Sequence, residues 1–142
     1  MKISNNGIAL IKQYEGCKLA EYICPAGKRT IGYGHTKGVV PGQKITKLQA
    51  DNFLRQDLME VEKSISLLVK KPLNQNQFDS IVSFIFNFGA TKFSTSTLLK
   101  KINVNPNDLT IANEFKRWIY SDNKISSGLI KRRNAEVKLY YS

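Results

Sequence analysis

The sequence predicts an α+β fold that is mainly helical and two-lobed, with a small antiparallel β-hairpin lobe and a long connecting helix. Three observations lead to this prediction. Residues 19–24 and 29–33 read as short strands on either side of a Pro-Ala-Gly turn. Residues 46–70 keep one apolar face at helical spacing, and residues 74–88 are apolar nearly all round. The length of 142 residues fits a single domain with its own core.

A helix over about residues 4–15 starts the chain, because Ser4 is a suitable N-cap and Gly16 a suitable stop. The small lobe then covers about residues 15–45. Alternation along its first strand puts three side chains on one face: Ala20, Tyr22 and Cys24. Residues 39–42 are expected to end a third element of this sheet, which is too thin to fold alone.

The connecting helix is expected over about residues 46–70. Thr46 and Gln49 form a capping-box pattern at its start, and Lys71-Pro72 stops it. Its apolar face runs for about five turns and consists of Leu54, Leu58, Val61, Ile65 and Leu68.

The helical lobe covers about residues 72–142, with the N-terminal helix packed against it. A second capping box runs from Asn74 to Gln77, and Gly89 ends the helix that follows. Because that helix is apolar nearly all round, it is expected to be the buried central helix. Shorter helices are expected over the rest of the lobe: residues 94–102, 106–118 and 127–141.

The net charge of +11 comes from 22 Lys and Arg against 11 Asp and Glu. It favours a polyanionic partner: nucleic acid, an anionic membrane or an acidic cell-wall polymer. The basic residues are scattered and lack a basic-aromatic pattern, so no specific nucleic acid is expected. A charge that only keeps the protein soluble is the plainer alternative. No metal or cofactor is expected, because two cysteines and one histidine are too few for a structural zinc site.

The stretch from Tyr14 to Thr36 contains the candidate active site. Glu15 at a helix end, Cys24 and Thr30 are polar groups that a helix leading into a hairpin can gather around one cleft. The turn after them adds two glycines, which shape the backbone and are candidate substrate contacts: Gly32 and Gly34.

The pattern Glu-x8-Cys-x5-Thr-Ile-Gly-Tyr-Gly-His-Thr, read from Glu15 to Thr36, resembles phage-type lysozymes, the endolysins of glycoside hydrolase family 24. Four further segments of that family follow in order: Asn76–Phe84 with Asn87-Phe88-Gly89, Ser96–Leu99, Arg117–Tyr120 and Gly128–Glu136. The resemblance covers about residues 4–141. One Gly-x-Gly turn is a weak signal, whereas five segments in order are a specific one.

The resemblance implies hydrolysis of the β-1,4 bond between N-acetylmuramic acid and N-acetylglucosamine in peptidoglycan, which lyses the host cell. By position, Glu15 is the general acid and Thr30 helps to hold the attacking water. Cys24 stands where the family has an aspartate, so the chain carries a Glu/Cys/Thr variant of the triad. The same pattern makes Arg132 a candidate basic partner of Glu15.

The chemistry accounts for these residue types. Hydrolysis takes a protonated acid on the leaving oxygen and a group that directs water, about 6.5 to 9.5 Å apart in inverting enzymes. The negative end of the helix dipole favours the protonated form of Glu15. A free thiol has a pKa of about 8.5, so Cys24 needs cations, with Lys28 and Arg29 as candidates, to be a thiolate near pH 7. We therefore expect a more alkaline optimum than in a carboxylate version.

Three neighbours of the site have structural interpretations. Strand alternation turns Glu21 away from Cys24 and toward solvent. His35 is expected to bond a carboxylate and support the turn, and Cys17 to be a packed thiol. A disulfide between Cys17 and Cys24 is the alternative, and it would disable Cys24.

On this interpretation the protein is a monomeric endolysin that stays in the host cytoplasm, since no export segment is visible. A separate holin-type protein would release it to the periplasm or cell wall, where its charge attracts it to the anionic envelope. Two other functions stay open: a lytic transglycosylase that uses Glu15 alone, and a non-catalytic cationic protein that binds envelopes or nucleic acid.

Overall fold

Helix α1 (Asn5–Glu15) opens the fold, and its two ends follow from local chemistry. In the computed structural model, which describes residues 1–142, the Ser4 hydroxyl accepts a hydrogen bond from the Gly7 N–H. Gly16 ends the helix with φ +67°, a conformation that glycine adopts without steric cost. The N-terminal prediction is confirmed, and Glu15 is the last residue of the helix.

Strands β1 (Lys18–Ile23) and β2 (Arg29–Gly32) form an antiparallel hairpin directly after α1. Tyr22 pairs with Thr30, and the register shifts between Lys18 and Tyr22. The third segment of this sheet differs from the prediction. Residues 41–42 form a turn, residues 39–40 belong to no helix or strand, and the pairing with β1 comes from a single bridge between Ala20 and Lys44. The Gln43 side-chain oxygen accepts from the Val40 N–H, and the Gln43 N–H donates to the Val40 carbonyl. These bonds close a turn over residues 40–43, so the pairing with β1 begins only at its end.

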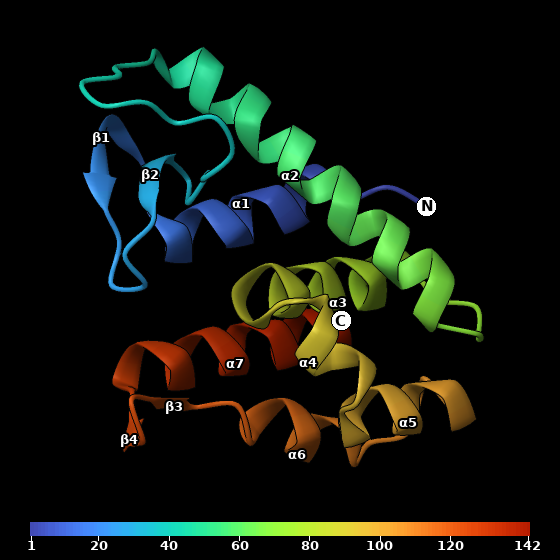
Figure 1. Cartoon of the computed structure of the whole chain (residues 1–142). Helices are drawn as coiled ribbons and strands as arrows, with labels where there is room; N and C mark the ends of the chain where they lie inside the picture. Colours follow the sequence, from blue (N-terminus) through green and yellow to red (C-terminus); the bar gives the residue numbers. More distant parts are fainter.

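Helix α2 (Lys47–Leu68) has the predicted capping box between Thr46 and Gln49. Its 22 residues extend for about 33 Å, and it contacts both β2 and α3 (Figure 1). Near its start, Ala50 packs against Gly32 of the hairpin. No helix of the chain combines the length and the apolar character that crossing a membrane requires.

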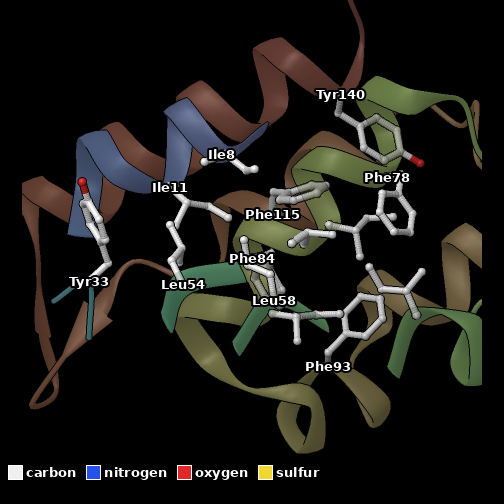
Figure 2. Close-up of a cluster of buried hydrophobic side chains, with 14 of the residues drawn as sticks. Ile8, Ile11, Tyr33, Leu54, Leu58, Phe78, Phe84, Phe93, Phe115 and Tyr140 are labelled. Atoms are coloured by element: carbon white, nitrogen blue, oxygen red, sulfur yellow. The ribbon is translucent and has the colours of Figure 1, made fainter. Parts of the chain in front are cut away.

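Helix α3 (Gln75–Phe88) is the centre of the helical part, as its all-round apolar pattern predicts. Every residue from 77 to 85 is buried, and the helix contacts α1, α2 and α7 (Ser127–Tyr140). Phe84 lies at the middle of an aromatic cluster with Phe93 and Phe115 (Figure 2). The buried apolar side chains form one continuous cluster from the hairpin to α7, so the chain has a single core.

The segment between α3 and α7 is more broken than predicted. It contains α4 (Ala90–Ser94), α5 (Thr97–Val104), α6 (Ile111–Lys116), and a hairpin of β3 (Tyr120–Ser121) and β4 (Lys124–Ile125). The helices expected over 94–102 and 106–118 are therefore shifted or shortened, and the second hairpin was missed. Its turn residues Asp122 and Asn123 have φ values of 50° and 64°, which Asp and Asn tolerate better than most residues.

Candidate active site

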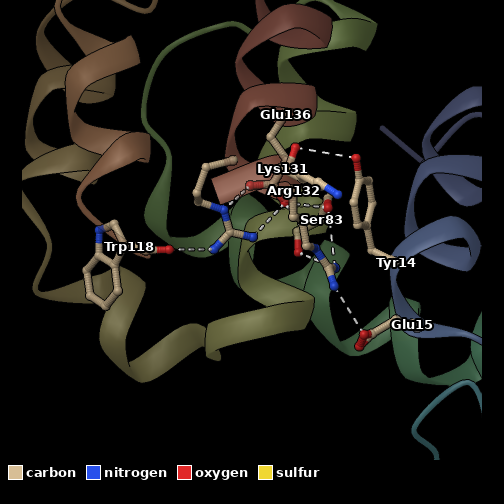
Figure 3. Close-up of polar contacts among 8 residues, drawn as sticks. Tyr14, Glu15, Ser83, Trp118, Lys131, Arg132 and Glu136 are labelled. Carbon is tan, nitrogen blue, oxygen red and sulfur yellow. Dashed lines mark hydrogen bonds and ion pairs between the residues drawn. The ribbon is translucent and has the colours of Figure 1, made fainter. Parts of the chain in front are cut away.

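Glu15 and Arg132 form an ion pair between the end of α1 and the middle of α7. Arg132 Nη1 lies 3.1 Å from Glu15 Oε2, as Figure 3 shows. The Arg132 side chain is only 4% exposed, whereas that of Glu15 keeps 19% of its surface in solvent. The acid therefore reaches the surface, and its basic partner is the residue that the sequence pattern indicated.

Arg132 is held by more than Glu15. Its Nη2 donates to the carbonyl oxygen of Ser83 (3.1 Å), and its Nε donates to Glu136 Oε2 (3.4 Å). Glu136 is fully buried and also accepts from the Ser83 hydroxyl and from Arg133. Two arginines and two glutamates thus compensate one another, which a buried charge requires.

Arg133 is the buried partner that sequence reasoning did not assign to the site. Its Nε lies 2.7 Å from Glu136 Oε1, and its guanidinium lies over the rings of Phe84 and Phe88. Burial lowers the pKa of Arg133, while the charge of Glu136 acts against that change. Burial likewise raises the pKa of Glu136, and Arg133 opposes the rise. A signal was present, because the helical spacing put Arg133 on an otherwise apolar face.

Cys24 lies just after β1, in the turn that joins the two strands. Its N–H donates to the Lys28 carbonyl (2.9 Å), and its own carbonyl accepts from the Gly27 N–H (2.8 Å). The thiol is half-buried and free. Hydrogen bonding from the Thr30 hydroxyl, followed by the Lys28 backbone N–H, lowers the pKa of Cys24.

The source of this lowering differs from the expectation. The charges of Lys28 and Arg29 were expected to favour the thiolate, but hydrogen-bond donors do so. The guanidinium of Arg29 instead binds Glu21, with Nη1 2.7 Å from Oε2. Glu21 also accepts from the Gly42 N–H, and both contacts lower its pKa. Glu21 is therefore committed to a structural ion pair on the hairpin.

Thr30 is buried in β2, and its hydroxyl donates to the Lys28 carbonyl oxygen (2.9 Å). A hydroxyl has a single hydrogen. When Cys24 is a thiolate, that hydrogen must rotate from the Lys28 carbonyl toward sulfur to stabilise the charge. Thr30 thus couples the protonation of Cys24 to the hydrogen bonding of the turn.

Tyr22 lies near the candidate residues, although sequence reasoning gave it no role. It is the strand partner of Thr30, and it is 37% exposed. Burial first, and then the negative charges of Cys24 and Glu15, raise the pKa of its phenol. The phenol is therefore within electrostatic reach of both groups. The alternation that put Tyr22 on the face of Cys24 was the signal that could have identified it.

His35 and the two glycines support the turn after β2. His35 is buried, its Nδ1 lies 2.9 Å from Asp57 Oδ2, and its ring stacks on Phe53 at 4.2 Å. Gly32 has φ +65° and is buried beside α2, which gives it a packing role. Gly34 has φ +87° and is exposed, with open space around its Cα, so it is the freer of the two to meet a ligand.

Cys17 packs at the edge of the core and is not bonded to Cys24. Burial, followed by the charges of Cys17 and Asp51, raises the pKa of Tyr33 beside it. Asp51 in turn lies 2.9 Å from the Lys12 ammonium, so this cluster ties α1 to α2. No three His, Cys, Asp or Glu side chains gather in a group suited to a metal ion.

A family model described as phage lysozyme matches residues 12–136, a range that contains Glu15, Cys24, Thr30 and Arg132. The chain belongs to the phage lysozyme family. An endolysin of the Acyrthosiphon pisum secondary endosymbiont phage 1 is 47% identical over 148 residues, which cover 100% of this chain and 99% of that protein.

Solved structures agree with this membership. The muramidase domain of SpmX from Asticaccaulis excentricus is 36% identical with a TM-score of 0.92, over 99% of this chain and 98% of that one. A variant of the lysozyme of Salmonella phage P22 is 39% identical with a TM-score of 0.89, over 100% of this chain and 99% of that one. This phage lysozyme is accordingly an enzyme of the muramidase type that acts on peptidoglycan, and its mainly helical fold with small hairpins is that of the family.

Proposed function

We propose that this lysozyme hydrolyses the β-1,4 bond between N-acetylmuramic acid and N-acetylglucosamine, with Glu15 as acid and Cys24 and Thr30 directing the water. One observation carries the assignment of residues. The phenol of Tyr22 is within electrostatic reach of Glu15 and of Cys24, and Tyr22 pairs with Thr30 in the hairpin. These relationships support an arrangement in which the acid, the thiol and the hydroxyl serve one site.

The first step belongs to Glu15. Protonated Glu15 gives its proton to the glycosidic oxygen as the bond between that oxygen and the anomeric carbon breaks. The carboxylate left behind faces Arg132 Nη1 at 3.1 Å. Because this ion pair is strongest once the proton has left, Arg132 stabilises the later stage of the transfer more than the starting acid.

The second step belongs to water. The Cys24 thiolate accepts a proton from a water molecule whose oxygen bonds to the anomeric carbon, which leaves a neutral thiol and a new sugar hydroxyl. The lowered pKa of Cys24 makes the thiolate available nearer to neutral pH than a free thiol would be. Thr30 holds the water and the sulfur through its hydroxyl.

The net charge of +11 supports a second part of the proposal, attraction of the monomer to an anionic cell envelope. Cytoplasmic storage followed by release through a holin-type protein, to the periplasm or cell wall, is the setting in which such an enzyme would work. The open arrangement of the site suits a long polymer, because Glu15 and Tyr22 both keep solvent-exposed surface.

A lytic transglycosylase is the second candidate, since the site holds one carboxylate and Glu21 is occupied by Arg29. Mass spectrometry of the released muropeptides separates the two: reducing ends support hydrolysis, and 1,6-anhydro ends support the transglycosylase. Glu15→Gln should release no muropeptides from purified peptidoglycan, whereas Glu21→Gln, a matched change on the hairpin, should remain active. Release of muropeptides by Glu15→Gln would refute the acid role, and cell lysis without released muropeptides would indicate disruption by charge alone.

A further inference from the structure

Glu136 lies outside the reacting groups, yet it contacts the arginine that serves them. It is fully buried on α7, and its Oε2 accepts from the Ser83 hydroxyl, Arg132 Nε (3.4 Å) and Arg133 Nη2 (3.0 Å). We infer that Glu136 is a positioning residue that limits how strongly Arg132 holds the proton-free form of Glu15. The inference rests on Glu15 being the acid, as proposed above.

The first part of the argument is geometric. Three nitrogens of the Arg132 guanidinium each have a different partner: Nε has Glu136, Nη2 has the Ser83 carbonyl, and Nη1 has Glu15. Because the guanidinium is planar, contacts that fix Nε and Nη2 also fix the direction in which Nη1 points. Only Nη1 is therefore offered to Glu15, as a single hydrogen bond of 3.1 Å.

The second part is a balance of charge. Arg132 and Arg133 both act on Glu15, since its charge raises the pKa of Arg133 from across the network. Glu136 is the fixed anion between these two cations. If Glu136 is replaced by a neutral residue, the charges of Arg132 and Arg133 act on Glu15 without this compensating anion. The Glu15 carboxyl then loses its proton at a lower pH. On the hairpin side, Tyr22 and Cys24 are the titratable groups that face Glu15.

The test is Glu136→Gln in the full chain, which keeps the shape of the side chain and removes its charge. We expect the alkaline limb of the pH–kcat profile to move to lower pH by roughly one unit. The reason is that Glu15 must remain protonated to act as the acid, and in this variant it loses its proton at a lower pH. Carbon-13 NMR titration of the Glu15 carboxyl, assigned with Glu15→Gln, should show the same displacement without relying on activity.

Two variants serve as comparisons. Glu114→Gln removes another buried glutamate that bonds two cations, Lys101 (3.1 Å) and Arg117 (3.2 Å), and it should leave the limb in place. Glu136→Gln combined with Arg133→Met removes one charge of each sign, so the limb should return toward that of the parent protein.

Glu136→Asp is used if the glutamine variant does not fold. The shorter aspartate side chain lies farther from Arg132, so we expect the alkaline limb to move in the same direction but by less. A folded Glu136 variant whose NMR titration and pH profile both superpose on those of the parent protein would overturn the inference. Activity in Glu15→Gln would instead refute the acid role itself, and the NMR titration would still report on the network.

Discussion

The carboxylate of Asp79 on α3 receives the N-terminus of α1 through Ser4, whose N–H donates to Oδ1 at 3.0 Å and whose hydroxyl donates to Oδ2. Gly7 makes this approach possible, because a Cβ there would lie 2.7 Å from the Asp79 carboxyl carbon. The helix that ends in Glu15 is thus fixed at one end by Asp79 and at the other by Arg132. Asp79 lies on α3 and Arg132 on α7, two helices that pack against each other.

We expect Asp79→Asn to lower the free energy of unfolding by about 1–2 kcal/mol, because it removes a buried negative charge from the positive end of α1. Urea denaturation followed by circular dichroism measures the change. Asp122→Asn is the matched control, since Asp122 is exposed in the β3–β4 turn. Equal stabilities for the two variants would contradict the anchoring role of Asp79.

Replacing Cys24 by Asp should move the acid limb and the optimum of activity to lower pH. A free carboxyl ionises near pH 4 and a free thiol near pH 8.5, so an aspartate supplies the water-directing anion at lower pH than a cysteine does. The measurement is muropeptide release against pH, with Cys17→Ser as the control that alters the other thiol. If the optimum of Cys24→Asp is no lower, Cys24 does not act as an anion in this reaction.

Thr30→Val should raise the pKa of the Cys24 thiol, because it deletes the donor with the largest lowering effect. The pH dependence of iodoacetamide alkylation, followed at Cys24 by mass spectrometry, reports this directly. Thr36→Val changes an exposed threonine after the same strand and should leave the alkylation profile unchanged. An unaltered profile in Thr30→Val would show that the hydroxyl does not stabilise the thiolate.

Mild oxidation should abolish activity if Cys17 and Cys24 can be joined, and a reductant should restore it. Both thiols are free and stand at opposite ends of the six-residue strand β1, so the bond would require this strand to leave its extended conformation. Cys17→Ala should then remain active after the same treatment. Full activity of the oxidised parent protein would show that no Cys17–Cys24 disulfide disables the enzyme.

Added salt should weaken binding to cell walls, since about 0.5 M salt reduces the reach of surface charge to a few ångströms. Co-sedimentation of Glu15→Gln with purified walls measures binding without digestion. Co-sedimentation with walls whose acidic groups have been amidated is the control and should respond less. Binding that is indifferent to salt would argue that the charge of +11 is not what attracts the protein to the wall.

The helices were predictable wherever sequence sets their ends or their burial. Both capping boxes are present as predicted, and the all-round apolar pattern located the buried helix α3. The β3–β4 hairpin was not predictable from periodicity, because each strand has only two residues and its turn depends on positive φ values at Asp122 and Asn123.

The site was predictable in part. The family pattern indicated Arg132 as the basic partner of Glu15, whereas the buried pair of Arg133 and Glu136 was not predicted. The two residues are three positions apart on α7, so their spacing is visible in the sequence. Their burial is not, because it depends on how α7 packs against α3. The donors to Cys24 were not recognised either: the Thr30 hydroxyl was predicted only to hold water, and the Lys28 N–H belongs to the backbone.

The single hydrogen of the Thr30 hydroxyl can bond either the Lys28 carbonyl or the Cys24 sulfur. While the sulfur is protonated, that hydrogen secures the Lys28 carbonyl and with it the loop of the hairpin. Once the sulfur is charged, the carbonyl loses this donor and keeps the Cys24 N–H as its remaining protein donor. The turn of the hairpin therefore has one hydrogen bond fewer at its Lys28 carbonyl while Cys24 is a thiolate than while it is a neutral thiol.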